Sequence, residues 1–140
     1  MDKEKLLKPG KLTPEEFEVM KTHTIIGGNA LDETCQLNKN ASFLEMGKDI
    51  AYFHHERWDG KGYPKKLKGQ EIPLAARIIA IADVYDAISS KRIYRQKIFN
   101  NEEIEELMNK ENGGLFDPEV FNVFFKIRGL FLKIKKSISN

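Results

Sequence analysis

The chain has 140 residues, enough for one domain, and its 41% hydrophobic and 31% charged residues are the composition of a globular protein. A formal net charge of +2 is too small to indicate a nucleic-acid polymer or an anionic membrane surface as a partner. The longest apolar runs, such as IIAIA at 78–82, fall far short of a membrane span, and no signal-peptide pattern opens the chain.

The sequence predicts an all-α fold of about five helices. The first is opened by Thr13 as N-cap, Pro14 at the first helical position and Glu16 closing a capping box, and we expect it to run from about 14 to the low thirties. Gly27 and Gly28 inside it indicate a bend or a close helix contact. The other helices are expected at about 42–55 with Ser42 and Glu45 as its cap, at 74–89, after Asn100, and after Asp117.

Three segments are not expected to be regular helix. Residues 56–73 carry Gly60, Gly62 and Pro64 among other helix breakers, so this segment is predicted to be a loop. Residues 1–12 have little apolar character and are interpreted as a connector, and 131–140 as a basic tail.

The chain has only three histidines, and two of them are adjacent. His54 and His55 would point about 100° apart on a helix, which suits a site with several metals, or a metal beside a phosphate, where the helix ends. The alternative is a pair of surface histidines at a frayed helix end. His23 is either a third ligand or a hydrogen-bonded histidine on the inner face of the first helix.

Asp83 is a carboxylate within the apolar run IIAIADVYDAI, so we expect it to be buried. An ionised carboxylate there needs a cation or several hydrogen-bond donors, and Asp86 would lie near the same face. The alternative is a buried ion pair with Arg77. Imidazole and carboxylate together favour iron, manganese or zinc, so His23, His54, His55 and Asp83 form a candidate metal constellation.

The chain also offers side chains suited to a nucleotide. Arg92 and Arg95 in SSKRIYRQK could bind phosphate oxygens with two donors each, although a solvated basic loop is the alternative. Tyr63 and Trp58 could stack on a planar base, or could simply pin the loop that carries them.

With these residues assembled, the sequence resembles the HD-GYP family, metal-dependent phosphodiesterases of the HD superfamily that hydrolyse cyclic di-GMP. The matching strings span residues 6 to about 125 and are LLKPGKLTPEEFEVMKTHTIIG, HHERWDGKGYP, IPLAARIIAIADVYDAI, SSKRIYR and GGLFDPEVF. Gly62, Tyr63 and Pro64 match the GYP of the family's name.

The resemblance implies an HD-superfamily helical bundle that lacks its first helices, with a partial HD-GYP domain at 13–130. The metal ligands it implies are His23, His54, His55 and Asp83. The substrate contacts it implies are Tyr63, Arg92 and Arg95, and the loop-shaping residues are Gly60, Gly62 and Pro64. The implied cofactor is a divalent iron, manganese or zinc ion.

The chain contains no His-Asp dipeptide, although the family's other signature is such a pair followed by a catalytic lysine. Without the bridging aspartate, two dications in one partly buried site would repel each other strongly. We therefore expect a single or substoichiometric metal ion, and weak or absent hydrolysis of cyclic di-GMP. Whether the chain is itself an enzyme stays open, and the alternative is a catalytically inactive module that binds a cyclic dinucleotide or another protein.

Two further expectations concern where the chain is found and how it associates. A single cysteine, Cys35, cannot form an internal disulfide, which fits a cytoplasmic protein. If the covering helices are lacking, apolar faces should be exposed, which predicts a homodimer or a domain-swapped dimer.

Overall fold

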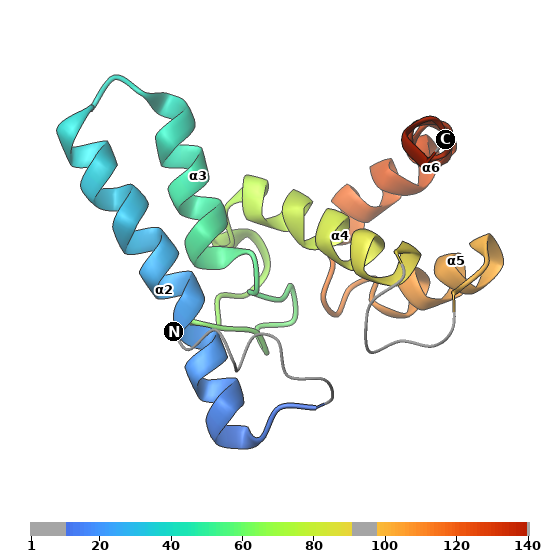
Figure 1. The fold of residues 1–140 in the computed structure, drawn as a ribbon, viewed down its shortest axis with the longest axis horizontal. Coiled ribbons are helices and arrows are strands. Elements are labelled where there is room, and N and C mark those ends of the chain that lie inside the picture. Colours follow the sequence, from blue (N-terminus) through green and yellow to red (C-terminus); the bar gives the residue numbers. More distant parts are fainter. Residues whose placement is uncertain (1–10, 91–97, 140) are drawn as a thin grey trace.

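A computed structural model describes residues 11–90 and 98–139. These residues form five α-helices and one 3₁₀ turn, so the predicted all-α fold is confirmed. The elements are α2 (Pro14–Leu37), α3 (Ser42–Phe53), η1 (Gly69–Glu71), α4 (Leu74–Ser89), α5 (Asn101–Lys110) and α6 (Pro118–Ser139). Figure 1 shows α2 and α3 on one side, α5 and α6 on the other, and α4 crossing between them.

The capping box predicted for α2 is confirmed. The Thr13 hydroxyl accepts the N–H of Glu16 at 3.2 Å, and the Glu16 carboxylate accepts the N–H of Thr13 at 2.8 Å. Asn100 and Glu103 form the same reciprocal pair at the start of α5. Because each box satisfies two N–H groups that a helix start leaves without partners, both helices begin where the sequence predicts.

The cap predicted for α3 is wrong. Ser42 is the first helical residue rather than the cap, and Ala41 takes the cap position without a side-chain hydrogen bond. Glu45 instead forms an ion pair with Lys48 at 2.7 Å, one turn further along the helix. The helix still starts at the expected place, because a cap side chain stabilises a helix end but is not required for it.

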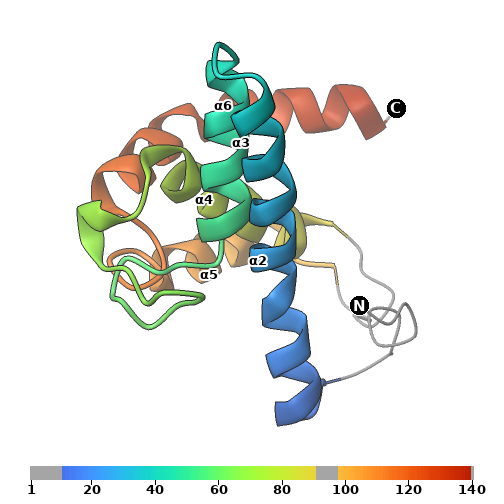
Figure 2. The ribbon, with the colours of Figure 1, turned by 90° about the vertical axis from the view of Figure 1, so that its left-hand side faces the viewer.

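The contact predicted at the paired glycines is between α2 and α3, which lie side by side in Figures 1 and 2. A Cβ added to Gly28 would lie 2.1 Å from an atom of the Tyr52 ring, whereas one added to Gly27 would meet only Ala51 Cβ at 3.7 Å. Gly28 is therefore the position that lets the aromatic ring of α3 lie directly on α2.

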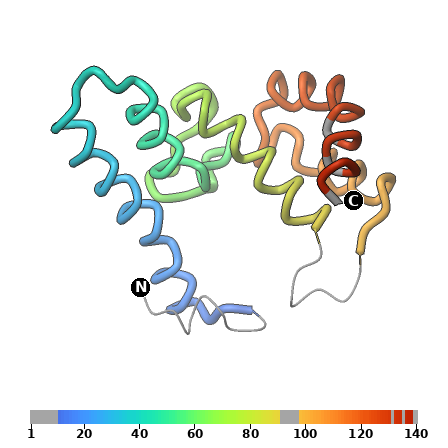
Figure 3. The backbone as a smooth tube through the Cα atoms, turned by 45° about the horizontal axis from the view of Figure 1, so that its top comes forward, coloured from blue at the N-terminus to red at the C-terminus, as the bar shows by residue number. Residues whose placement is uncertain are grey.

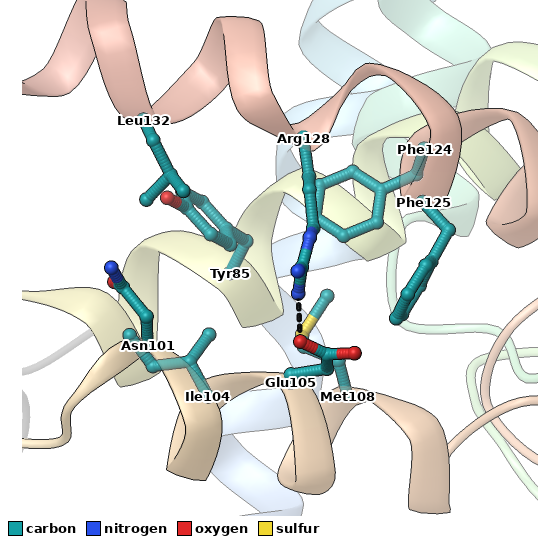
Figure 4. A pocket seen from close by; sticks show the side chains of 9 residues that line it. All are labelled: Tyr85, Asn101, Ile104, Glu105, Met108, Phe124, Phe125, Arg128 and Leu132. Carbon is teal, nitrogen blue, oxygen red and sulfur yellow. Dashed lines mark hydrogen bonds and ion pairs between the residues drawn. The ribbon is translucent and has the colours of Figure 1, made fainter.

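The buried core lies between α4, α5 and α6. Its members are apolar and almost fully inaccessible to water: Ile81, Ile104, Met108, Phe116, Phe121 and Phe124. Where the three helices meet, the ion pair of Glu105 and Arg128 and the Tyr85 ring help to line a small cavity of about 20 Å³, as Figure 4 shows. This core fixes the carboxyl-terminal half of α4, the half that carries Asp83.

The prediction that α4 is buried over most of its surface is wrong. One face of α4 packs against the core through Ile81, but Leu74 and Ile78 are about half exposed, and Asp83 is exposed. The reason is that the described helices cover only part of this apolar helix.

Helix α6 continues through Ser139, so the basic residues at 131–139 extend the helix. In Figure 3 its last turns run in a different direction from its first turns.

The expected domain boundaries, with the connector ending at residue 12 and the partial HD-GYP domain ending at residue 130, stay predictions. Among the helices in the described part of the chain, none combines the length and apolar character needed to cross a bilayer.

Candidate metal centre and cleft

The loop that follows α3 turns back onto the histidine pair. The N–H of Tyr63 donates to the carbonyl of His55 at 3.2 Å. A Cβ on Gly62 would lie 2.5 Å from both the His55 carbonyl oxygen and the Arg57 nitrogen, so only glycine fits against this backbone. Gly60 has a φ of +80°, a conformation that glycine adopts without strain. The Tyr63–Pro64 peptide bond is cis.

Glu56 fastens the far side of this turn from within the protein. It is 2% exposed, and its two carboxylate oxygens accept the N–H of Lys65 at 2.6 Å and the N–H of Leu67 at 2.9 Å. A buried carboxylate that accepts two backbone donors is satisfied without a counter-ion. Glu56 therefore holds the residues after Pro64 beside the end of α3.

The same loop is tied to the segment between α5 and α6. The N–H groups of Trp58 and Asp59 donate to the carbonyls of Leu115 at 3.2 Å and Gly114 at 2.9 Å. The Arg57 guanidinium pairs with Asp59 at 2.9 Å, which holds the pKa of Asp59 below its usual value. The loop is thus fixed at both of its sides, and Figure 1 shows it (green) below α3, between α2 and α4.

The three histidines converge, although they come from α2 and from the end of α3. Their ligand nitrogens all lie within 4.8 Å of one another, and the Nε2 atoms of His23 and His54 are 3.3 Å apart. The Nδ1 of His23 contacts the carbonyl of Met20 at 2.5 Å, and the Nδ1 of His54 contacts the carbonyl of Ile50 at 2.8 Å. A carbonyl only accepts, so both Nδ1 atoms carry hydrogen.

This arrangement fits a transition metal. With Nδ1 protonated, the Nε2 of each neutral ring presents a lone pair, and metal-bound histidines usually donate their other nitrogen in this way. Two such lone pairs 3.3 Å apart repel unless a proton or a cation lies between them. Three imidazoles are a donor set that zinc and other borderline metals accept, with positions left open.

His55 is held in its neutral form. Burial, together with the neighbouring His54 and His23, lowers its pKa to about 4. The ring of Tyr63 stacks on it at 4.9 Å between centroids and 17° between planes. Burial also raises the pKa of Tyr63, so its phenol keeps its proton. A neutral imidazole is the form that binds a metal.

Asp83 lines the same cleft but is not part of the histidine group. Among the described residues, that group is the only set of three or more possible ligand atoms that lie within 4.8 Å of one another. Its pKa is raised, chiefly because its surroundings desolvate it, while His54 opposes the rise and Asp86 adds to it. The alternative ion pair with Arg77 is wrong, since Arg77 binds Asp117 at 2.6 Å.

A cleft of about 850 Å³ opens beside the histidines, and its walls differ in charge. The wall nearest α2 and the loop carries cations, namely Lys21, Arg57, Lys61 and Lys66. The wall formed by α4 carries the carboxylates Asp83 and Asp86. Tyr63 lines the cleft as well as packing on His55, and its expected contact with a nucleotide base stays a prediction.

Two of the predicted site residues, Arg92 and Arg95, lie outside the described residues. The sequence interpretation missed Glu56, Phe17 and Lys21. Glu56 stands next to His55 in the string that indicated the site, and Phe17 and Lys21 are one helical turn apart on the helix that carries His23. Their closeness in sequence to His55 and to His23 was the signal that could have indicated them.

The structure shows an all-α scaffold on which three histidines, one from α2 and two from the end of α3, lie close enough together to share a metal ion. A family model described as an HD domain matches residues 3–120. The chain belongs to this HD-domain family, in its HD-GYP type.

Curated relatives agree with this membership. A cyclic di-GMP phosphodiesterase of Vibrio cholerae is 46% identical over 129 residues, which cover 92% of this chain and 26% of the relative. One of Thermotoga maritima is 47% identical over 122 residues, 87% of this chain and 32% of the relative. A 3'3'-cGAMP-specific phosphodiesterase of Vibrio cholerae is 36% identical over 133 residues, 95% of this chain and 24% of the relative. The chain thus spans about a quarter to a third of the relatives' length.

Proposed function

We propose that the chain binds one divalent metal ion through His23, His54 and His55 and a cyclic dinucleotide in the adjoining cleft. The observation that carries this proposal is the approach of three histidine nitrogens to within 4.8 Å beside a cleft with one basic wall. Cyclic di-GMP is the first candidate and 3'3'-cGAMP the second, because these are the substrates that the relatives' names give.

We further propose that hydrolysis by this chain is weak or absent. A bound metal would supply positive charge for a phosphate oxygen and acidify a water molecule. This sequence offers no His-Asp pair to bridge a second metal. The chain would then act as a nucleotide-binding module derived from a phosphodiesterase.

The remaining predicted residues belong to the same proposal. Asp83 would complete the metal's ligands from α4, which its place in the cleft beside His54 supports. Arg92 and Arg95 would bind the phosphates. The metal would be iron, manganese or zinc, because imidazole suits each of them. A cytoplasmic location also stays part of the proposal.

Calorimetry with cyclic di-GMP, together with analysis of the products, tests these proposals. Saturable binding without product is the expected result. Turnover at the rate of an intact relative would contradict the inactivity, and no heat at millimolar ligand would contradict the binding and favour a protein-interaction module. The double variant His23→Ala/His54→Ala should lose the metal, and the exposed Asn29→Ala serves as control.

We also propose self-association of two copies through an apolar groove of about 270 Å³ between α4 and α6. Ile78, Val123 and Ile127 line it, and each is about half exposed. Along α6, exposed apolar residues recur at Val123, Ile127, Leu130 and Ile134, a spacing of four, three and four that suits helix pairing. Light scattering should give a dimer for the chain and a monomer for Ile127→Glu; a monomeric parent chain would contradict this.

A further inference from the structure

The amino-terminal half of α2 presents an aromatic ring and a cation to the cleft. Phe17 and Lys21 are four residues apart, so they lie on the same face of α2. Both line the cleft beside Tyr63 and His55. The Lys21 ammonium lies 5.0 Å from the Phe17 ring centroid and 5.7 Å from that of Tyr63.

The three rings form a continuous series that leads away from the histidines. Tyr63 stacks on His55 at 4.9 Å, and Phe17 meets Tyr63 edge-on at 6.0 Å. The Phe17 side of the series remains open, because this residue is 43% exposed. A large aromatic ring left this accessible adds little to the core. It does offer a face on which a planar base can stack.

The charges near this ring favour an anion. Lys21 is held at 2.8 Å by Glu18, whose side chain points largely into water at 70% exposure. Lys61 and Lys66, from the loop after α3, line the same cleft, while the carboxylates Asp83 and Asp86 come from α4. A phosphate next to Lys21 would therefore have further cations within the cleft, and the acidic side chains come from a different helix than Lys21.

We propose that Phe17 and Lys21 form a nucleotide-docking subsite, in which a purine base stacks on Phe17 and a phosphate of the same ligand binds the Lys21 ammonium. The subsite rests on the proposed binding of a cyclic dinucleotide and adds the residues that select for it. A base on Phe17 would leave the phosphates free to reach toward the histidines, since Tyr63 and His55 continue the same wall.

Calorimetry with cyclic di-GMP, and with guanosine monophosphate as a smaller probe, tests the subsite on the 140-residue chain. Phe17→Ala should weaken the binding of both ligands about tenfold, because stacking of a base on an aromatic side chain contributes roughly this much to the affinity. Lys21→Met should weaken binding and also reduce its dependence on salt, because one phosphate contact is lost. Circular dichroism and a urea titration establish that each variant is folded.

Matched controls lie elsewhere on the surface. Phe43 is 72% exposed on α3, and Lys39 is exposed between α2 and α3, so Phe43→Ala and Lys39→Met remove the same groups away from the cleft. These controls should bind as the parent chain does. If the parent binds but Phe17→Ala and Lys21→Met bind equally well, the subsite is wrong while the proposed function stands. If the parent binds neither ligand, both are wrong.

Discussion

The buried carboxylate of Glu56 accepts the backbone N–H of Lys65 at 2.6 Å, across the turn that contains Tyr63. Together with the hydrogen bond from the Leu67 N–H, this contact connects the end of α3 to the residues that follow the turn. Because Tyr63 stacks on His55, a change at Glu56 should be felt at the candidate metal centre, which Glu56 does not itself join.

Glu56→Gln tests this connection. An amide presents only one acceptor, so one of the two backbone N–H groups would be left buried without a partner. The free energy of unfolding should fall by about 1–3 kcal/mol, the cost of such a donor. Zinc affinity, measured by competition with a chromogenic chelator, should fall as well. Glu71→Gln is the control, since Glu71 accepts the Lys68 N–H at 2.8 Å but is exposed. Equal zinc affinity in parent and Glu56→Gln would contradict the connection.

The two adjacent glycines of α2 should respond oppositely to alanine. In Gly28→Ala the new methyl would collide with the Tyr52 ring, which should force α2 and α3 apart and cost about 1–3 kcal/mol of unfolding free energy. Gly27→Ala meets only ordinary contact and should stabilise the helix by about 0.5–1 kcal/mol. Urea titrations measure both. Similar values for the two variants would mean that Tyr52 does not pack as described.

The ion pair of Arg77 and Asp117 joins α4 to the start of α6, and the Asp117 side chain is 2% exposed. Arg77→Met should lower the unfolding free energy by about 3 kcal/mol, because it leaves a buried carboxylate without its cation. Asp117→Asn in the same chain should recover part of this loss, since the neutral side chain no longer needs a cation. Thermal and urea unfolding measure the loss and its recovery. If the losses of unfolding free energy in the two single variants simply add in the double variant, the pairing is contradicted.

The stability of the metal-free protein should depend on pH through His55. The pKa of this residue is lowered from 6.5 to about 4, chiefly by burial. Between these two values the unfolded chain binds a proton that the folded chain does not, so the free energy of unfolding should decrease as the pH falls from about 6.5 to 4. Urea titrations across this range, with chelator present, measure the slope. His55→Asn should reduce the dependence of the unfolding free energy on pH. An unchanged slope in this variant would mean that other groups cause the dependence.

The sequence predicted the helices well where local chemistry decides them. The Thr13 capping box, the asparagine cap at Asn100 and the proline at the start of α6 are local signals, and the structure follows them. The extent of burial was predicted less well. The apolar composition of α4 indicated a helix buried over most of its surface, yet Ile78 is 47% exposed. Burial depends on which elements surround a helix, and composition does not contain that information.

The histidine cluster was predicted in part from spacing and in part from family resemblance. Adjacent histidines at a helix end indicated a site, but the placement of His23 against them depends on how α2 packs on α3, through Gly28. The role of Glu56 needs the path of the chain between residues 56 and 67, which no local pattern specifies. The partner of Arg77 is likewise set by tertiary structure, forty residues away along the chain.

Metal content per chain tests the central claim most directly. Elemental analysis of protein purified without chelator, alongside the variant His23→Ala/His54→Ala, should give up to one iron, manganese or zinc ion per parent chain and none in the variant. Equal metal in parent and variant would contradict the assignment of the histidines. Two or more ions per parent chain would contradict the single-metal account, and with it the reason for expecting weak hydrolysis.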